Sequence, residues 1–262
     1  NVVDRAAAAG VIITASHNPP QWNGFKYKPE YGGSATPEVI AQLEHEISQV
    51  RKERHVHICS LAQAQEAGLL HYIDPSRQYL ARLGTALDLA SIRNGSLKVA
   101  VDSMYGAGAG YLPRLLSGGS TSTVEVRSER NPAFPDMSQP EPIACNLGPL
   151  VDAINQKDAD IGIALDGDAD RLGIMDEHGQ FITTLQTFSL LCLYWLEVRG
   201  ERGPIVKSLT QSRMVNMLGA LYNVPVYETP VGFKHVGPVM VRENALAAGE
   251  ESGGYAFRGH IP

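Results

Sequence analysis

Short apolar segments alternate with amphipathic segments along most of this chain, and this alternation constrains the fold more than any other feature. Leu97–Asp102 is an apolar run that leads into a Gly-rich turn and a helical segment ending near Leu116. Ile161–Leu165 is a second such run, and Pro204–Lys207 is a third, followed by a helical segment over Ser212–Leu221. Strands that alternate with helices are typical of α/β domains. The sequence therefore predicts an α/β fold in which mixed sheets are flanked by helices.

The succession of strand, turn and helix recurs in each third of the chain and predicts three similar α/β domains. A length of 262 residues suits two or three domains. We place the domains at residues 1–91, 92–184 and 185–262, and we expect an active site in the cleft where they meet. Further helices are predicted over Pro37–Arg54, Pro75–Leu89 and Leu147–Gln156, and another after Gly179 that ends at Val198. Further strands are predicted over Val11–Ile13, Val124–Val126 and Val224–Tyr227, and we expect the first of these to be buried.

Composition and charge argue against several classes of protein. The net charge of −6 argues against a nucleic-acid surface, which normally carries a basic stripe. The most apolar run, Phe188–Leu196, is shorter than the about 20 residues that a membrane-spanning helix needs, and it predicts a buried helix. Cys59, Cys145 and Cys192 stand far apart with no C-x-x-C pair, so we expect reduced thiols, no zinc site and a cytoplasmic protein.

The segment Asp166-Gly167-Asp168-Ala169-Asp170-Arg171 places three carboxylates at alternating positions directly after a predicted strand. Where the chain turns, these side chains converge into the oxygen-only ligand set that a hard divalent cation prefers. A solvated acidic turn is the simplest alternative. An EF-hand is a poor one, because Arg171 stands where that loop needs glycine and the flanks resemble strands. A phosphatase of the D-x-D type remains open, since its nucleophilic aspartate also follows a strand.

Ser16 distinguishes between these alternatives. It lies in Thr14-Ala15-Ser16-His17-Asn18-Pro19-Pro20, a loop that its two prolines keep out of helix and sheet. A serine needs activation before it attacks, and no G-x-S-x-G elbow surrounds this one. Lys26 follows Asn23-Gly24-Phe25 and is placed to supply a proton or to hold a phosphate. Taken alone, Ser16 would be a turn residue, and only its neighbours favour a nucleophile.

Two further loops carry polar groups between glycines. Gly249-Glu250-Glu251-Ser252-Gly253-Gly254 offers carboxylates and a hydroxyl, which suit sugar hydroxyls that both donate and accept hydrogen bonds. Thr229-Pro230-Val231-Gly232-Phe233-Lys234 places one cation after a glycine. Either string alone is common in ordinary turns.

These four segments, in this order, resemble the α-D-phosphohexomutase family, which includes phosphoglucomutases, phosphomannomutases and phosphoglucosamine mutases. T-A-S-H-N-P-P with N-G-F-K resembles the family's serine loop, D-G-D-A-D-R its metal loop, and G-E-E-S-G its sugar loop. The resemblance covers nearly the whole chain, including residues 131–142 before the metal loop. The serine and metal loops together are highly specific.

The resemblance implies a role for each loop. Ser16 would carry the phosphate, with Lys26 as general acid and base. Asp166, Asp168 and Asp170 would bind Mg²⁺, together with an oxygen of phosphorylated Ser16. The residues implied to contact substrate are His17, Arg171, Thr229, Gly232, Lys234, Glu250 and Ser252.

The implied reaction interconverts hexose 1-phosphate and hexose 6-phosphate, a phosphorylated hexose being the expected partner. Phospho-Ser16 would give its phosphate to the free hydroxyl and form a hexose 1,6-bisphosphate, which also primes the enzyme. The intermediate would turn over in a closed cleft, and its other phosphate would return to Ser16. The resemblance also implies a preference for glucose over mannose through Glu251. Family members that prefer glucose phosphates often have G-E-E-S there, whereas dual mannose/glucose enzymes often have Met at this position and glucosamine enzymes have Gln.

The resemblance also implies parts of a longer protein. The family has opening strands that would precede Asn1 and a C-terminal domain with a phosphate-binding loop that would follow Pro262, so we expect both ends to be cuts and the first domain to be truncated. Gly254 stands where some relatives have a histidine. His260 is the nearest substitute, although a surface histidine without a catalytic role is the simpler interpretation. A D-x-D phosphatase and a non-catalytic divalent-ion-binding fragment remain the alternatives, and a monomer and a homodimer are equally compatible with the sequence.

Overall fold

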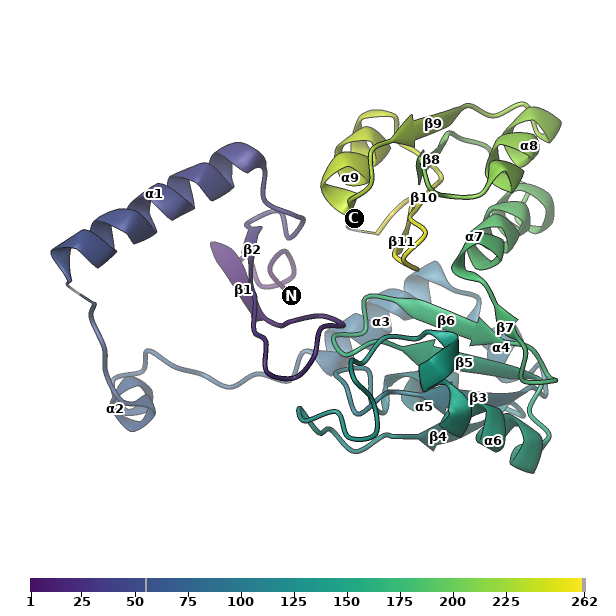
Figure 1. Ribbon diagram of the computed structural model, residues 1–262, viewed down its shortest axis with the longest axis horizontal. Coiled ribbons are helices and arrows are strands. Elements are labelled where there is room, and N and C mark those ends of the chain that lie inside the picture. The colour runs from purple at the N-terminus through teal and green to yellow at the C-terminus, as the bar shows by residue number, and fades with distance from the viewer. Residues whose placement is uncertain (55, 261–262) are drawn as a thin grey trace. The chain divides into compact units, whose positions relative to one another are not determined.

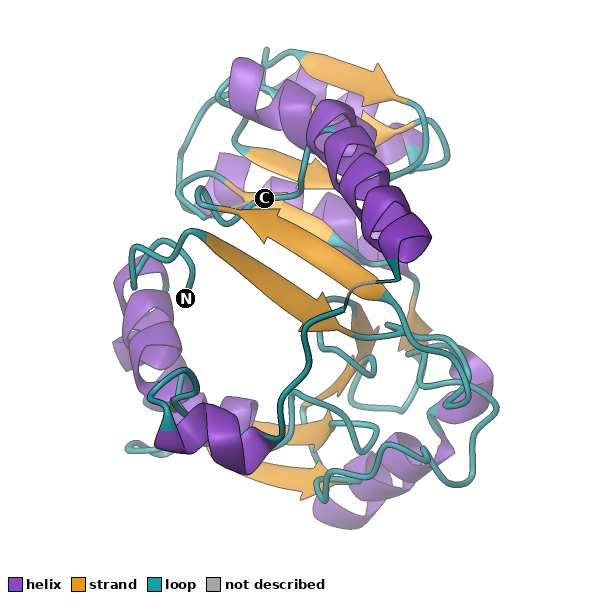
Figure 2. Cartoon of the chain, turned by 90° about the vertical axis from the view of Figure 1, so that its left-hand side faces the viewer, coloured by secondary structure: helices purple, strands orange, loops and turns teal. Residues whose placement is uncertain are grey.

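The computed structural model describes residues 1–54 and 56–260. The chain divides into two compact units, one formed by residues 1–10 and 27–83 and the other by residues 11–26 and 84–262. Figure 1 traces the chain by residue number, and Figure 2 distinguishes its helices, strands and loops. The second unit contains both large sheets and the serine, metal and sugar loops.

The first unit is mainly helical. The helix α1 (Pro37–Glu53) begins where the Thr36 hydroxyl accepts a hydrogen bond from the Val39 amide, and it ends at Arg54, whose φ is 51°. A capping box at Ser60 starts α2 (Leu61–Glu66), and α3 (Ser76–Ala86) follows and crosses the boundary between the units after Leu83. The predicted helix over Pro37–Arg54 is therefore confirmed.

The strands β1 (Ala9–Ile13) and β2 (Phe25–Pro29) form a two-stranded sheet, and the serine loop joins them. The predicted strand at Val11–Ile13 is present, but the prediction that it is buried is wrong. Val11, Ile12 and Ile13 are 54%, 42% and 64% exposed. Among the described strands β1 pairs with β2 alone, so it is an edge of a two-stranded sheet and not the interior strand that its apolar sequence suggested.

A five-stranded sheet has the order β4-β3-β5-β6-β7. The strands β4 (Ser122–Val126), β3 (Lys98–Asp102) and β5 (Ile161–Leu165) are parallel. The strands β6 (Leu172–Met175) and β7 (Phe181–Ile182) continue the sheet in antiparallel fashion. The predicted strands over Leu97–Asp102 and Ile161–Leu165 are thus confirmed.

Both faces of this sheet are buried. Ala100 and Ala164 face α6 (Gly148–Lys157), which follows the short 3₁₀ turn η1 (Ala144–Asn146). Val99 and Val101 belong to the opposite cluster, which includes residues of α4 (Leu89–Arg93) and α5 (Tyr111–Leu116). Successive residues of a strand point to opposite faces, so the near-continuous apolar runs of the sequence correspond to strands covered on both sides.

A four-stranded sheet has the order β11-β10-β8-β9. The strands β10 (Ala247–Gly249), β8 (Ile205–Ser208) and β9 (Val226–Thr229) are parallel, and β11 (Tyr255–Phe257) is antiparallel to β10. The helices α7 (Thr184–Leu193) and α8 (Arg213–Leu221) pack on one face, and α9 (Phe233–Arg242) packs on the other.

The two large sheets have the same topology. In each, the first strand is central, the second and third flank it in parallel, and the fourth is antiparallel to the third. The metal loop joins β5 to β6, and the sugar loop joins β10 to β11. The repeat predicted from sequence is therefore real for these two sheets, and the two loops hold equivalent positions in it.

The apolar run in α7 is buried along one side only. The α-helix ends at Leu193 and continues as a π-helical turn, η2 (Tyr194–Val198). Phe188, Cys192 and Leu196 are buried, whereas Leu190 is 52% and Tyr194 is 43% exposed. The predicted buried helix is therefore present, with one side buried and the other exposed. Within the described residues, no helix is long and apolar enough to cross a membrane.

Candidate active site

The serine loop is held in shape by its own backbone and by Thr14. Ser16 has a φ of 54°, which is uncommon for a residue with a side chain. The Thr14 hydroxyl accepts a hydrogen bond of 2.8 Å from the Ser16 amide and so supports this conformation. Gly24 approaches the loop closely, because a Cβ there would lie 2.5 Å from the Thr14 carbonyl oxygen. A hollow of about 420 Å³ opens on this loop and includes both Ser16 and Lys26 in its lining.

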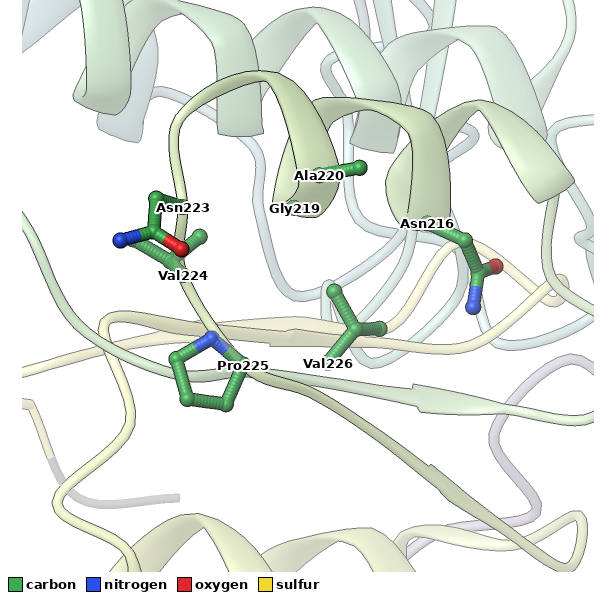
Figure 3. A pocket seen from close by; sticks show the side chains of 7 residues that line it. All are labelled: Asn216, Gly219, Ala220, Asn223, Val224, Pro225 and Val226. Carbon is green, nitrogen blue, oxygen red and sulfur yellow. The ribbon is translucent and has the colours of Figure 1, made fainter.

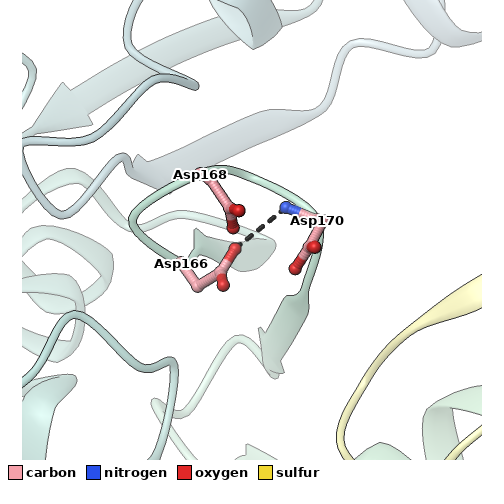
Figure 4. A group of neighbouring side chains, drawn as sticks. All are labelled: Asp166, Asp168 and Asp170. Carbon is pink, nitrogen blue, oxygen red and sulfur yellow. Dashed lines mark hydrogen bonds between the residues drawn. The ribbon is translucent and has the colours of Figure 1, made fainter. Parts of the chain in front are cut away.

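The metal loop turns so that its three carboxylates converge (Figure 4). The Asp166 Oδ1 atom accepts hydrogen bonds from the amides of Asp170 at 2.9 Å and Arg171 at 3.1 Å. One oxygen from each of Asp166, Asp168 and Asp170 lies within 4.8 Å of the others. The turn predicted from the alternating aspartates is therefore present.

The metal loop fits a hard divalent cation. The Asp168 Oδ1 atom is buried and has no hydrogen-bond partner among the described residues. Burying a carboxylate oxygen without a partner costs free energy, and a cation is a natural partner for it in a loop where three carboxylates converge. Three carboxylates form an oxygen-only donor set, which suits Mg²⁺ better than a softer metal.

The serine and metal loops meet, although 150 residues separate Ser16 from Asp166. The Ser16 hydroxyl donates a long hydrogen bond of 3.4 Å to Asp166 Oδ2. Lys26 Nζ lies 3.1 Å from Asp168 Oδ2 and 3.3 Å from Asp170 Oδ2. The structure thus brings the two predicted catalytic side chains to the three predicted metal ligands.

Two contacts that the sequence did not suggest join these loops. The Thr14 hydroxyl donates to Asp168 Oδ2 at 3.0 Å, while its oxygen accepts from the Ser16 amide. A Cβ on Gly167 would lie 2.7 Å from the Ser16 carbonyl oxygen, so the backbones can approach only because this residue is glycine. The T-x-S spacing is a weak sequence signal for the turn in which Thr14 binds the Ser16 amide. Nothing in the local sequence indicates that Thr14 also contacts Asp168.

The three charged groups around Ser16 have different pKa shifts. Burial, together with Asp170 and Asp168, raises the pKa of Asp166 to about 7. Burial opposes ionisation of Asp168 as well, but the Lys26 ammonium and the hydrogen bonds from Lys26 and Thr14 outweigh it and lower that pKa. Burial would lower the pKa of Lys26, yet the carboxylates of Asp168 and Asp170 prevail and raise it. Lys26 is therefore protonated at neutral pH.

His17 and Arg171 lie beside the serine. The His17 Nδ1 atom is 3.5 Å from Ser16 Oγ, and burial together with the Arg171 guanidinium lowers the pKa of this imidazole. Arg171 pairs with Glu141 at 3.0 Å. Glu141 belongs to the Pro-rich segment before the metal loop, and nothing in its local sequence indicates this role.

The sugar loop is anchored at its two acidic residues. Glu250 is buried, which raises the pKa of its carboxyl, and it accepts a hydrogen bond of 2.6 Å from the Gly232 amide. Glu251 accepts hydrogen bonds from the hydroxyls of Ser208, at 2.8 Å, and Thr210. The structure therefore connects the sugar loop to the Gly232 loop and to the end of β8.

The remaining predicted substrate residues occupy different surroundings. Thr229 is 5% exposed, and its hydroxyl donates to the Pro230 carbonyl at 3.0 Å. Lys234 is exposed in the first turn of α9, and Ser252 is partly buried in the sugar loop. A separate hollow of about 410 Å³ lies between the end of α8 and β9 (Figure 3) and contains none of the predicted site residues.

Family models match almost the entire chain. Residues 1–54 match domain I of phosphoglucomutase/phosphomannomutase, residues 77–179 match domain II and residues 185–262 match domain III, each described as an alpha/beta/alpha domain. The chain belongs to the phosphoglucomutase/phosphomannomutase family. This confirms the family and the α/β class inferred from sequence.

Individual relatives agree with the family assignment. A phosphoglucomutase/phosphomannomutase of Thermococcus kodakarensis is 32% identical over 96% of this chain and 53% of its own length. A protein of Thermococcus gammatolerans, named a probable phosphoglucosamine mutase, is 33% identical over 94% of this chain and 52% of its own length. The chain thus spans about half the length of these curated relatives.

Solved structures show the same fold. A Thermus thermophilus protein described as a phosphomannomutase superposes with a TM-score of 0.82 at 32% identity, covering 100% of this chain and 57% of its own. A family member from Burkholderia thailandensis gives a TM-score of 0.77 at 25% identity, covering 95% of this chain and 51% of its own. More distant N-acetylphosphoglucosamine mutases of Aspergillus fumigatus were solved with glucose 1,6-bisphosphate or with GlcNAc-6P and magnesium.

Proposed function

We propose that this chain carries the serine, metal and sugar loops of a Mg²⁺-dependent phosphohexomutase, which interconverts hexose 1-phosphate and hexose 6-phosphate through phospho-Ser16 and a hexose 1,6-bisphosphate. The observation that supports this most is the position of Ser16 Oγ, 3.4 Å from Asp166 Oδ2 within the group of three aspartates. A phosphate on this oxygen would lie beside the cation site and beside the Lys26 ammonium.

The charges around Ser16 suit a phosphoryl group that arrives and leaves. A phosphoserine carries about −1.5 to −2 charges, which three carboxylates alone would repel. Mg²⁺ bound by Asp166, Asp168 and Asp170 would supply the positive charge that offsets this repulsion. Lys26 and Arg171 add fixed positive charge from the protein, and neutral His17 adds a hydrogen-bonding group next to Ser16.

Lys26 is placed to transfer the proton that each phosphoryl transfer requires. When the bond between phosphorus and Ser16 Oγ breaks, that oxygen needs a proton, and the sugar hydroxyl that attacks phosphorus loses one. Lys26 is protonated in the resting state, so we assign it the donation to Ser16 Oγ and the recovery of a proton from the sugar hydroxyl. In the second transfer the same exchange runs in reverse, because Ser16 is then the attacking group.

The geometry supports the mutase over the alternatives. A D-x-D phosphatase would aim a free Asp166 oxygen at phosphorus and leave the serine remote. Here Asp166 Oδ1 accepts two amide hydrogen bonds, and Asp166 Oδ2 faces Ser16. A protein that only binds a divalent ion would have no reason to hold Ser16 and Lys26 against the ion site.

For the hexose, we propose that glucose phosphates are preferred to mannose phosphates, on the basis of Glu251 and the G-E-E-S form of the loop. Several curated relatives are named phosphoglucosamine mutases, so glucosamine phosphate is the second candidate. The values of kcat/KM for the 1-phosphates of glucose, mannose and glucosamine decide between them, and a higher value for either of the other sugars would contradict the glucose assignment. A cytoplasmic location and a monomer or homodimer remain predictions.

The identity of the phosphate carrier tests the proposal directly. The full-length protein is incubated with ³²P-labelled glucose 1,6-bisphosphate and Mg²⁺, and the labelled peptide is mapped. We expect label on Ser16, no label and no mutase activity in Ser16→Ala, and normal labelling in Ser48→Ala, whose serine is exposed on α1. Label on Asp166, or activity retained in Ser16→Ala, would instead support the phosphatase.

A further inference from the structure

The shared topology of the two large sheets places two supporting loops in equivalent positions. In each sheet the first strand is hydrogen-bonded to the third, so the loops that follow these two strands leave the sheet side by side. The first-strand loops are residues 103–110 after β3 and residues 209–212 after β8. Their neighbours are the metal loop after β5 and the sugar loop after β10.

In the five-stranded sheet, the supporting loop contacts the backbone of the metal loop. The Ala107 amide donates a hydrogen bond of 3.0 Å to the Gly167 carbonyl oxygen. A Cβ on Gly106 would lie 2.6 Å from that same oxygen and 3.1 Å from the Asp166 carbonyl oxygen. The contact is between two backbones, so neither side can yield by rotating a side chain.

Gly108 continues this contact. A Cβ there would lie 2.5 Å from Leu165 Cδ1 and 3.2 Å from the Ala169 Cβ. Residues 106–108 therefore pack against the metal loop from its start to the residue before Asp170. These close approaches explain why the turn is rich in glycine, although none of its glycines has a proposed catalytic role.

In the four-stranded sheet, the equivalent contact is made by side chains. Ser208 ends β8 and donates to Glu251 Oε2 at 2.8 Å, and Thr210 donates to the same oxygen. The Thr184 hydroxyl donates to the Glu251 carbonyl oxygen at 2.5 Å. Glu251 is thereby fixed between Glu250 and Ser252, the two residues expected to meet the sugar.

We propose that in each sheet the end of the first strand and the loop that follows it form a positioning element for the loop after the third strand. Gly106 and Gly108 set the geometry of the metal ligands, and Ser208 and Thr210 set the geometry of Glu250 and Ser252 through Glu251. The assignment deepens the proposed function and rests on it, because it takes the two supported loops to be the metal and sugar loops. Glu251 then influences the sugar through the position of its neighbours.

The first arm of the test measures metal binding without catalysis. In the full-length protein, Mn²⁺ is titrated as a substitute for Mg²⁺ by electron paramagnetic resonance. We expect Gly106→Ala to weaken binding by about 10–100-fold, as changes behind metal ligands typically do. Gly148→Ala is the matched control, because a Cβ at that position would meet no atom within 4 Å apart from its chain neighbours and its own helix backbone, and its affinity should equal that of the wild type. Where Gly106→Ala does not fold, Gly108→Ala takes its place, since its closest clash is with a side chain.

The second arm measures sugar binding. We expect Thr210→Val combined with Ser208→Ala to raise the Kd for glucose 1-phosphate by about tenfold or more, since hydrogen bonds to a charged group are lost. The affinity for Mn²⁺ should stay unchanged in this variant. Thr210→Ser keeps the hydroxyl and should retain most of the affinity for the sugar phosphate. Each supporting loop is therefore expected to affect only its own partner.

The outcomes separate this inference from the proposed function. Unchanged Mn²⁺ affinity in a folded Gly106→Ala or Gly108→Ala protein would overturn the inference, as would unchanged sugar affinity without the two hydroxyls. A wild-type protein that binds Mn²⁺ and sugar phosphate but transfers no phosphate would contradict the proposed function alone.

Discussion

At the scale of single residues, two of the three aspartates in the metal loop differ in burial and in hydrogen bonding. Asp166 is fully buried, and its Oδ1 is saturated by two amides. Asp168 is bonded through Oδ2 to Thr14 and Lys26, while its Oδ1 is buried without a partner among the described residues. These differences determine which variants and which pH changes should affect metal binding at the proposed site.

Asp168→Asn should abolish mutase activity in the full-length protein and leave it folded. The amide removes one negative charge from the site and replaces a carboxylate oxygen with a weaker ligand. Substitutions of residues that only support a metal ligand typically lower metal affinity by about 10–100-fold. Because Asp168 is itself a proposed ligand, we expect the loss of Mg²⁺ affinity to be at least as large. Calorimetric titration measures the Mg²⁺ affinity, and circular dichroism checks that the variant is folded. Asp152→Asn, on the exposed side of α6, is the control. Wild-type turnover by Asp168→Asn would remove this residue from the metal site.

Metal binding should weaken as the pH falls below about 7, the value to which burial and the two neighbouring aspartates raise the pKa of Asp166. Below that pH the metal-free protein holds a proton on Asp166, and the cation must displace it. Above that pH the carboxylate is already ionised, so the affinity should level off. For one displaced proton, we expect about a tenfold loss of apparent Mg²⁺ affinity per pH unit on the acid side. Titrations at pH 8, 7 and 6 that give one constant affinity would contradict this.

At the scale of secondary-structure elements, what could be predicted depended on local pattern. Runs such as Ile161–Leu165 and the Thr36-Pro37 helix start have local causes, and both elements appear where the sequence placed them. The exposure of Val11–Ile13 could not be predicted, because it depends on which strands pair with β1. The same holds for the contacts of Thr14 with Asp168 and of Ser208 with Glu251, whose partners are distant in the chain.

The helix α6 offers a test of how strongly packing supports the metal loop's sheet. Leu150 is fully buried against the strands that lead to the metal loop, and a Cβ on Gly162 of β5 would lie 3.2 Å from its side chain. Leu150→Ala should lower the free energy of unfolding by about 2–5 kcal/mol, because it leaves a cavity. Leu221→Ala, at a position 73% exposed on α8, should change it by less than about 0.5 kcal/mol. Urea unfolding measures both, and equal effects would contradict the assigned core.

At the scale of the whole molecule, the serine loop belongs to the unit that contains the metal loop, although residues 27–83 of the other unit intervene in the chain. The second unit contains the buried clusters on both faces of both large sheets. In the first unit, α1 and α2 bury none of their residues. The parts of the proposed reaction carried by Ser16, Lys26 and the aspartates therefore depend on one well-packed unit.

Hydrogen exchange should reveal this division. Amides exchange through local opening where few apolar side chains are buried, and through global unfolding where the core is dense. We expect the amides of α1 to exchange at least about a hundredfold faster than those of β3 and β8, which are largely buried, and of β5, whose residues are buried or partly buried. Mg²⁺ should slow exchange in the metal loop of the wild type but not of Asp168→Asn, because a ligand stabilises only the state that binds it. Mass spectrometry of peptic peptides gives these rates, and the Asp152→Asn protein should respond to Mg²⁺ as the wild type does. Equal protection of α1 and β3 would show that the first unit shares the stability of the second, and a Mg²⁺ effect in Asp168→Asn would place the cation elsewhere.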